Sequence, residues 1–374
     1  MAIDLNLISV VVFYSLVFLY FYIKRKNVTR QLGIIFLYKT QRFTGIMRAI
    51  ANWNPKLWQW FGYASIPIGF TGMFVIFGYL IHALIKVLTT PGAQAGLSLA
   101  IPGVHIPGSI FIPFWYGIIA LFAVIVVHEG MHGIVSEAWG LKLKSAGVGL
   151  AAILPLAFVE PPEDKLMKAK TGTQLGIFSA GVAANLVFAI CVFVLLNFAI
   201  APAANGVLIK GVAAGTPAAL AGMQVDEVIT QAGGASIKTV SDFSDAMKNV
   251  KPSEYVTIAT NKNQYLVKTI EHPDAKAKNR AYVGISFRQS FPWGLFHLSN
   301  LLYWMFVLNI GIGLVNLLPL GPIDGGRMLN IVLNRRLKNQ QTAAKIFGAV
   351  TYLSLFLLLA NIIVPYLVRA AAVL

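Results

Sequence analysis

The stretch Val127-His128-Glu129-Gly130-Met131-His132 identifies the helix around which the rest of this chain is organised. It lies inside the apolar run Phe111–Val135. That run is long enough to cross a bilayer as a helix. Ionisable side chains are unfavourable at such a depth and usually mark a functional site. At the spacing His-x-x-x-His both imidazoles project from one helical face, where two ring nitrogens can hold a zinc ion. The stretch therefore predicts a metal centre within a membrane span.

Composition supports a membrane protein. The 374 residues are 57% hydrophobic and only 12% charged, whereas soluble domains are about a quarter charged. The net charge of +16 comes largely from short basic loops beside apolar runs, which indicates a lipid bilayer as the partner and argues against nucleic acid. Cys191 is the only cysteine, so no intrachain disulfide is expected. The first apolar run is expected to be a retained anchor.

We therefore expect a polytopic α-helical membrane protein with about six transmembrane helices. Lys24–Lys56 carries eight Lys or Arg and no acid, which places it in the cytoplasm and both termini outside. The loop Thr89–Ser109 is broken by Gly and Pro, and it either dips back into the membrane or stays extracellular. The expected spans are Leu7–Ile23, Phe61–Leu88, Phe111–Val135, Leu175–Ile200, Trp293–Leu318 and Phe347–Leu367.

The segment Trp139–Thr173, which follows the His-Glu helix, mixes two patterns. Leu141–Lys144 alternates and Val148–Val159 is apolar, which together favour short strands. Such strands at the membrane surface would form a re-entrant β-region with an unpaired edge, to which an extended peptide adds as a further strand. An ordinary cytoplasmic connection is the alternative.

Small residues open the fourth span. Ser179–Ala184 allows a close approach of helices, so Gly181 is expected to face the metal-bearing helix. Asn185 follows directly. Two roles are open for its side chain: a hydrogen bond between helices, or donation to a substrate carbonyl or oxyanion.

The composition becomes polar at Ala203 and stays so to about Arg288, which indicates an inserted small α/β domain. By span count this domain lies outside the cytoplasm. The expected divisions are 1–110 with two N-terminal helices, 111–202 and 291–345 as the two halves of the core, 203–290 as the inserted domain, and 346–374 as the last helix.

Asp324 completes the expected metal site. Two prolines and three glycines between Pro319 and Gly326 interrupt the fifth span, so Asp324 is expected on irregular backbone at membrane depth. The topology brings it to the same side as His128 and His132. One zinc ion with water in the fourth position would be a catalytic rather than a structural site. Glu129 would be the general base.

These motifs resemble those of the site-2 proteases, which are zinc-dependent intramembrane metalloproteases. The match is His128-Glu129-x-x-His132, Gly181-x-x-x-Asn185 and Asn316-x-x-Pro319-x-x-x-x-Asp324-Gly325, in this order. The resemblance implies a membrane-spanning substrate contacted by Asn185, Asn316 and Pro319. Residues 206–212 and 221–229 are similar to a PDZ domain, with Asp226 at a turn where glycine is usual. Such a domain would bind a peptide or filter substrates by size.

The sequence thus predicts a prokaryotic membrane zinc endopeptidase that cleaves transmembrane segments near the cytoplasmic face. Two alternatives remain. One is a non-catalytic receptor or chaperone that binds peptides through the PDZ-like domain. The other is a metal transporter that uses the same ligands as a transit site.

Overall fold

The computed structural model describes residues 5–25, 28–31, 35–90, 96–97, 101–106, 109–151, 154–274, 279–292 and 294–371. The chain divides into two compact units, Met1–Phe193 with Leu301–Leu374, and Val194–Asn300. Trp293, the expected start of the fifth span, and part of the loop Thr89–Ser109 lie outside the described residues.

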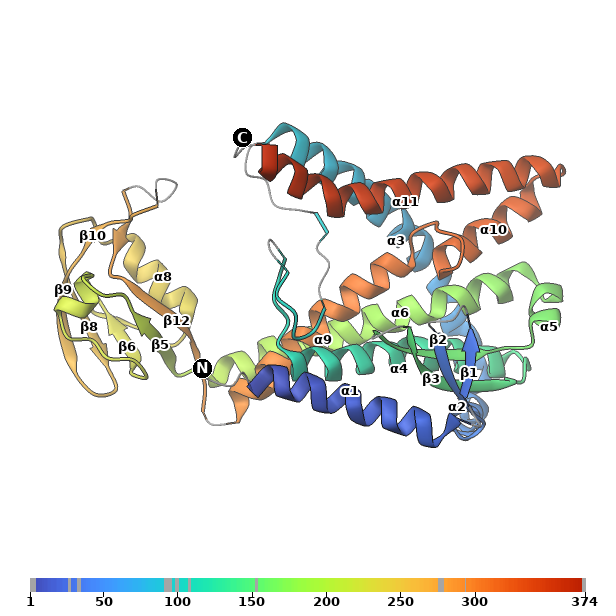
Figure 1. Cartoon of the computed structure of the whole chain (residues 1–374), viewed down its shortest axis with the longest axis horizontal. Coiled ribbons are helices and arrows are strands. Elements are labelled where there is room, and N and C mark those ends of the chain that lie inside the picture. Colours follow the sequence, from blue (N-terminus) through green and yellow to red (C-terminus); the bar gives the residue numbers. More distant parts are fainter. Residues whose placement is uncertain are drawn as a thin grey trace. The chain divides into compact units, whose positions relative to one another are not determined.

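Within the described ranges, five helices are long and apolar enough to cross a membrane (Figure 1). They are α3 (Pro55–Thr89), α4 (Phe114–Ala138), α6 (Thr171–Leu195) with a continuation to Ala203, α9 (Leu295–Asn316) and α11 (Gln340–Ala371). Helix α1 (Leu5–Ile23) is also apolar but shorter. The chain is therefore a polytopic helical membrane protein, and the number of six spans stays a prediction.

A four-stranded antiparallel sheet lies beside the helices, in the order β1-β2-β3-β4. Strands β3 (Ser145–Ala151) and β4 (Leu154–Glu160) form the expected hairpin, whereas Leu141–Lys144 is not a strand. The other two strands, β1 (Val28–Gln31) and β2 (Ile35–Thr40), come from the basic segment. Because β2 pairs with β3, only β4 of the hairpin keeps an open edge, and β1 is the edge strand on the other side of the sheet.

Helix α2 (Arg42–Trp53) holds the C-terminal end of α4 in place. The buried carboxylate of Glu137 accepts hydrogen bonds from Arg48 Nε at 3.1 Å and Nη2 at 3.3 Å. It also accepts one from the backbone N–H of Leu143 at 2.9 Å. A buried carboxylate is stable only with such partners, so these contacts tie α2 and the start of the hairpin to the helix that carries the histidines.

Close helix packing forms the core of the first unit. Figure 1 shows α3 and α11 side by side, and Asn361 Nδ2 on α11 donates to the carbonyl of Leu80 at 2.9 Å. Ser65 and Ser179 join α3 to α6 through a hydrogen bond of 2.8 Å between their hydroxyls. Small residues permit this approach, since side chains on Gly62 and Gly176 would clash with Trp139.

The segment after α9 differs from its expectation. Residues 317–323 are irregular, as the prolines predict, but Asp324 is the first residue of helix α10 (Asp324–Arg336). Ile323 is the N-cap, with extended backbone. Residues 328–345 are helical except for 337–339. Asp324 is thus held on the first turn of a helix rather than on irregular backbone.

The second unit contains the strands β5 (Gly206–Val212), β6 (Val228–Ala232), β8 (Tyr255–Thr260), β9 (Gln264–Lys268) and β12 (Ile285–Ser290), with short β7 (Ala235–Ser236), β10 (Ile270–Glu271) and β11 (Ala281–Tyr282). Its helices are α7 (Pro217–Leu220) and α8 (Val240–Lys248), which starts with a capping box between Thr239 and Asp242. Asp226 has φ 63°, in the left-handed region that favours glycine. The PDZ assignment and the expected divisions stay predictions.

Candidate metal centre

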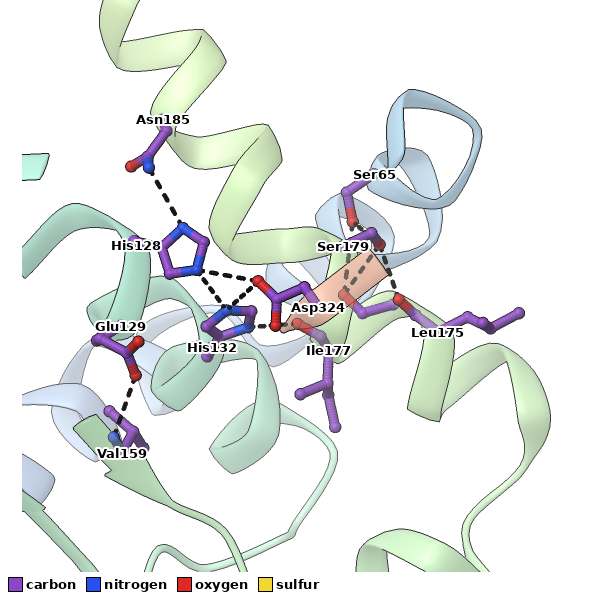
Figure 2. A network of polar contacts seen from close by, with 11 residues as sticks. Ser65, His128, Glu129, His132, Val159, Leu175, Ile177, Ser179, Asn185 and Asp324 are labelled. Carbon is purple, nitrogen blue, oxygen red and sulfur yellow. Dashed lines mark hydrogen bonds and ion pairs between the residues drawn. The ribbon is translucent and has the colours of Figure 1, made fainter. Parts of the chain in front are cut away.

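His128 and His132 lie one turn apart on α4 and converge with Asp324 of α10 (Figure 2). Asp324 Oδ2 is 3.0 Å from His128 Nε2 and 3.2 Å from His132 Nε2. The two Nε2 atoms are 3.1 Å apart. The structure therefore brings together, at one point, two residues close in sequence and a third from almost two hundred residues later.

Two glycines bring Asp324 to this point. A Cβ on Gly325 would collide with the backbone of Leu317 and Leu318, and one on Gly326 would collide with that of Leu320. Any larger residue would therefore push the start of α10 away from the irregular segment that follows α9. This close approach explains why two residues with poor helix propensity occupy the first turn of a helix.

The orientation of His132 is set by its second nitrogen. Nδ1 lies 2.6 Å from the carbonyl oxygen of Ile177. A carbonyl can only accept, so Nδ1 carries the proton and Nε2 of the neutral ring keeps its lone pair for a metal. Gly181 faces the same ring, and a Cβ there would collide with it, which confirms the expected contact between α6 and the metal-bearing helix.

The three donor atoms fit a zinc ion. Ligands bound tetrahedrally at zinc–ligand distances of about 2.0–2.1 Å stand about 3.3 Å apart. The observed separations of 3.0, 3.1 and 3.2 Å are close to this value. Two imidazoles and one carboxylate are also a donor set that leaves the fourth position of a catalytic zinc open.

Glu129 lies beside the three donors. Its Oε2 accepts a hydrogen bond from the backbone N–H of Val159 on β4 at 3.2 Å, as Figure 2 shows. The carboxylate, His128, His132 and Asp324 all line a cavity of about 280 Å³, together with Phe158 and residues of α6 and α10. The site is therefore a chamber bounded on one side by the edge strand.

The three residues expected to contact a substrate occupy different places. Asn316 lines the chamber. Pro319 is buried, its carbonyl accepts from Thr351 Oγ1 at 3.4 Å, and it is not among the described residues that line the chamber. Asn185 is fully buried behind His128, with Nδ2 3.2 Å from His128 Nδ1.

The chamber also contains a charged residue that the sequence analysis did not name. Arg327 lies on the first turn of α10, lines the chamber and places its guanidinium 5.2 Å from the ring centre of Phe178. Its position three residues after Asp324 in a helix puts both on one face. The three-residue spacing of Asp324 and Arg327 indicates a shared face only once Asp324 is known to start a helix.

Comparison with known proteins agrees with this geometry. The sequence profile of peptidase family M50 matches residues 116–360, and the chain belongs to this family of site-2 proteases, as its motifs predict. The uncharacterized protein MJ0971 of Methanocaldococcus jannaschii is 32% identical over 281 residues, which are 74% of this chain and 72% of that protein. The zinc metalloprotease RasP of Oceanobacillus iheyensis is 23% identical over 230 residues, 47% of this chain and 54% of that protein.

Proposed function

We propose that this chain is a zinc-dependent endopeptidase that hydrolyses peptide bonds in the transmembrane segments of membrane-anchored proteins. One observation carries the proposal. His128, His132 and Asp324 place three ligand atoms within 4.8 Å of one another. Glu129 adjoins them in the same chamber, in a unit built from apolar helices.

The side chains divide the chemistry between them. His128, His132 and Asp324 would hold the metal. Zinc bound there would supply a Lewis acid that polarises the scissile carbonyl and activates water. Glu129 takes a proton from the attacking water and returns it to the nitrogen of the leaving chain. The N–H of Val159 keeps the carboxylate of Glu129 turned toward the chamber.

The substrate must reach this chamber unwound, because helical carbonyls are occupied by their own hydrogen bonds. Strand β4 offers an edge for the extended segment, since N–H groups along a strand alternate between its two neighbours. The backbone N–H of Val159 is directed away from β3, toward Glu129, so the N–H of Ala157, two residues earlier, is directed to the same open edge. Pro155 lies at the next position along this edge and has no N–H to leave unpaired. Proline is tolerated at an edge of this kind.

An apolar cavity of about 510 Å³ adjoins the chamber and is proposed to receive the helical part of the substrate. It is lined by Pro155 of β4, by Ile112 before α4 and by residues of α9 such as Trp304. Asn316 lines both this cavity and the chamber, which supports its role as a substrate contact. Pro319 contributes indirectly, by keeping the segment after α9 irregular.

The orientation in a prokaryotic cell membrane is also proposed. The basic segment Lys24–Lys56 favours a cytoplasmic position. Helix α4 then runs inward, so the active site opens toward the cytoplasm. The second unit would be extracytoplasmic, and a peptide ligand of its PDZ-like fold would regulate which substrates enter.

Reconstituted protein with zinc and a purified single-span substrate, whose helix carries Gly and Pro at its centre, tests the proposal. The wild type is expected to cleave within the helix, and Glu129→Gln to lose at least about 100-fold in rate while keeping its metal. Glu271→Gln, an exposed glutamate of the second unit, serves as the matched control and should cleave as the wild type does.

The two alternatives predict other outcomes. A receptor or chaperone would bind its partner equally well with Glu129→Gln and would cleave nothing. A transporter would carry zinc into sealed vesicles. Metal flux, or an absence of cleavage by the wild type under conditions where it binds zinc, would overturn the proposal.

A further inference from the structure

Asn185 on α6 makes one polar contact with the metal centre and leaves one polar atom without a partner. Its side chain is fully buried, with Nδ2 3.2 Å from His128 Nδ1. Its Oδ1 has no hydrogen-bond partner among the described residues. Within the described residues His128 is the only partner of this amide, so this one contact decides which end of the amide faces the ring.

The proton on His128 decides which end of the amide belongs at the ring. An amide nitrogen donates, and a donor facing Nδ1 places the ring proton on Nε2. A protonated Nε2 cannot ligate a metal. When Nε2 is a ligand, Nδ1 carries the proton, and the Asn185 nitrogen would then face another donor. A half-turn of the amide removes this conflict, because the oxygen then accepts from Nδ1–H, and the two ends of an amide are assigned only by their hydrogen bonds.

We propose that Asn185 is a positioning residue whose side-chain oxygen accepts from Nδ1–H of His128 and keeps the Nε2 lone pair directed at the metal. The inference rests on the proposed function, since it takes His128 as a ligand. Partners of this kind fix the tautomer and the orientation of metal-bound histidines. Asn185 does for His128 what the carbonyl of Ile177 does for His132.

The position of Asn185 argues against direct contact with a substrate. Figure 2 shows its amide on the side of the His128 ring that faces away from Asp324 and His132. Asn185 is not among the described residues that line the chamber. A substrate in the chamber would therefore meet His128 and not the amide behind it.

The spacing of Gly181 and Asn185 on α6 also supports a positioning role for Asn185. Gly181 and Asn185 lie one turn apart on α6, and they contact His132 and His128, which lie one turn apart on α4. The glycine makes room for one ring, and the amide binds the other. Gly313 of α9 closes the far side, since a Cβ there would lie 3.5 Å from Asn185 Cβ. The Gly-x-x-x-Asn spacing thus matches the His-x-x-x-His spacing residue for residue.

Zinc affinity of purified full-length variants, measured by competition with a chelator, tests the inference without relying on turnover. Asn185→Leu keeps the approximate shape and removes the acceptor, so its zinc affinity is expected to fall about 10- to 100-fold. Asn185→Asp keeps an acceptor oxygen at the ring, so its affinity should stay within about threefold of the wild type. Asn309→Leu is the matched control, because Asn309 is equally buried on α9 and contacts the carbonyl of Met305 instead.

The aspartate variant separates the two roles of Asn185. A donor to a substrate carbonyl would be lost in Asn185→Asp, which would then cleave poorly, while Asn185→Leu would keep full zinc affinity. That pattern would overturn the inference. As a check that does not depend on stable variants, the ¹⁵N spectrum of zinc-loaded wild type should show His128 protonated at Nδ1, and a proton at Nε2 would contradict the inference. A wild type that binds no zinc would instead refute the proposed function itself.

Discussion

The backbone N–H of Val159 on β4 donates a hydrogen bond to Glu129 Oε2 on α4 at 3.2 Å. This contact joins the edge of the sheet to the carboxylate proposed as the general base. Strand β4 and the proposed general base are therefore coupled through one donor. If an added substrate strand shifts β4, it also shifts the direction of the carboxylate.

Val159→Pro is expected to lower the cleavage rate roughly 10- to 100-fold, because it removes one hydrogen bond to a charged group without touching a metal ligand. Zinc content should remain that of the wild type. Proline already occupies position 155 on the same open edge, so a second proline at position 159 should be compatible with the backbone of this edge. Single-turnover cleavage assays check this, and an unchanged rate would show that the contact does not serve Glu129.

Ala157→Pro tests the edge itself. The backbone N–H of Ala157 is directed away from β3, and Ala157 lies two residues before Val159, which contacts Glu129. The proline variant lacks this N–H. Its loss should raise KM and leave kcat close to that of the wild type, since binding of the extended segment weakens while the chemistry stays intact. A fall in kcat with an unchanged KM would argue that substrates do not add to β4.

Gly325→Ala is expected to destabilise the site. The added methyl would collide with the backbone of Leu317 and Leu318, and overpacking of this kind costs about 1–3 kcal/mol. Both the apparent Tm and the zinc content should fall, because Asp324 must move. Gly321→Ala is the matched control in the same segment, since nothing lies within 4 Å of its Cβ position. Equal behaviour of the two variants would contradict this account.

The pH dependence of stability has a specific contribution from Glu160. Ser145 Oγ donates to its carboxylate at 2.6 Å and Lys39 Nζ at 3.0 Å, and these contacts lower its pKa below the ordinary value. A lowered pKa in the folded state stabilises the fold above the unfolded pKa of about 4.3 and loses this effect as the pH falls through the folded value.

Glu160→Gln should therefore be slightly less stable than the wild type at pH 7, by less than about 1 kcal/mol because both partners are more than a third exposed. The difference should vanish toward pH 3. Thermal unfolding in detergent at a series of pH values measures it. A difference that grows on acidification would have the wrong sign for this explanation.

Much of the site could be predicted from the sequence because its ligands lie in short, regular patterns. The spacing of His128 and His132 places them on one helical face whatever surrounds them. Asp324 could be added because membrane topology fixes the side on which each span ends. Long apolar helices are likewise visible without any knowledge of their neighbours.

The remainder depends on contacts that no local pattern shows. Strand β1 has the sequence Val-Thr-Arg-Gln, which has little apolar alternation and forms a strand only because β2 pairs with it. The glycines after Asp324 predict irregular backbone, yet they are helical, and the irregular segment that follows α9 packs directly against them. Asn185 carries two roles by residue type alone, and its burial behind His128, which only the structure shows, supports the proposed positioning role.

Zinc per purified protein, measured side by side for the wild type, Asp324→Ala and Asp164→Ala, tests the central claim most directly. Asp164 is exposed on α5 (Glu163–Lys168) and serves as the control. The account predicts about one zinc in the wild type and in Asp164→Ala, removable by a chelator, with a clear loss in Asp324→Ala. A wild type without zinc, or an Asp324→Ala variant that binds it as tightly as the wild type, would contradict the three-ligand site.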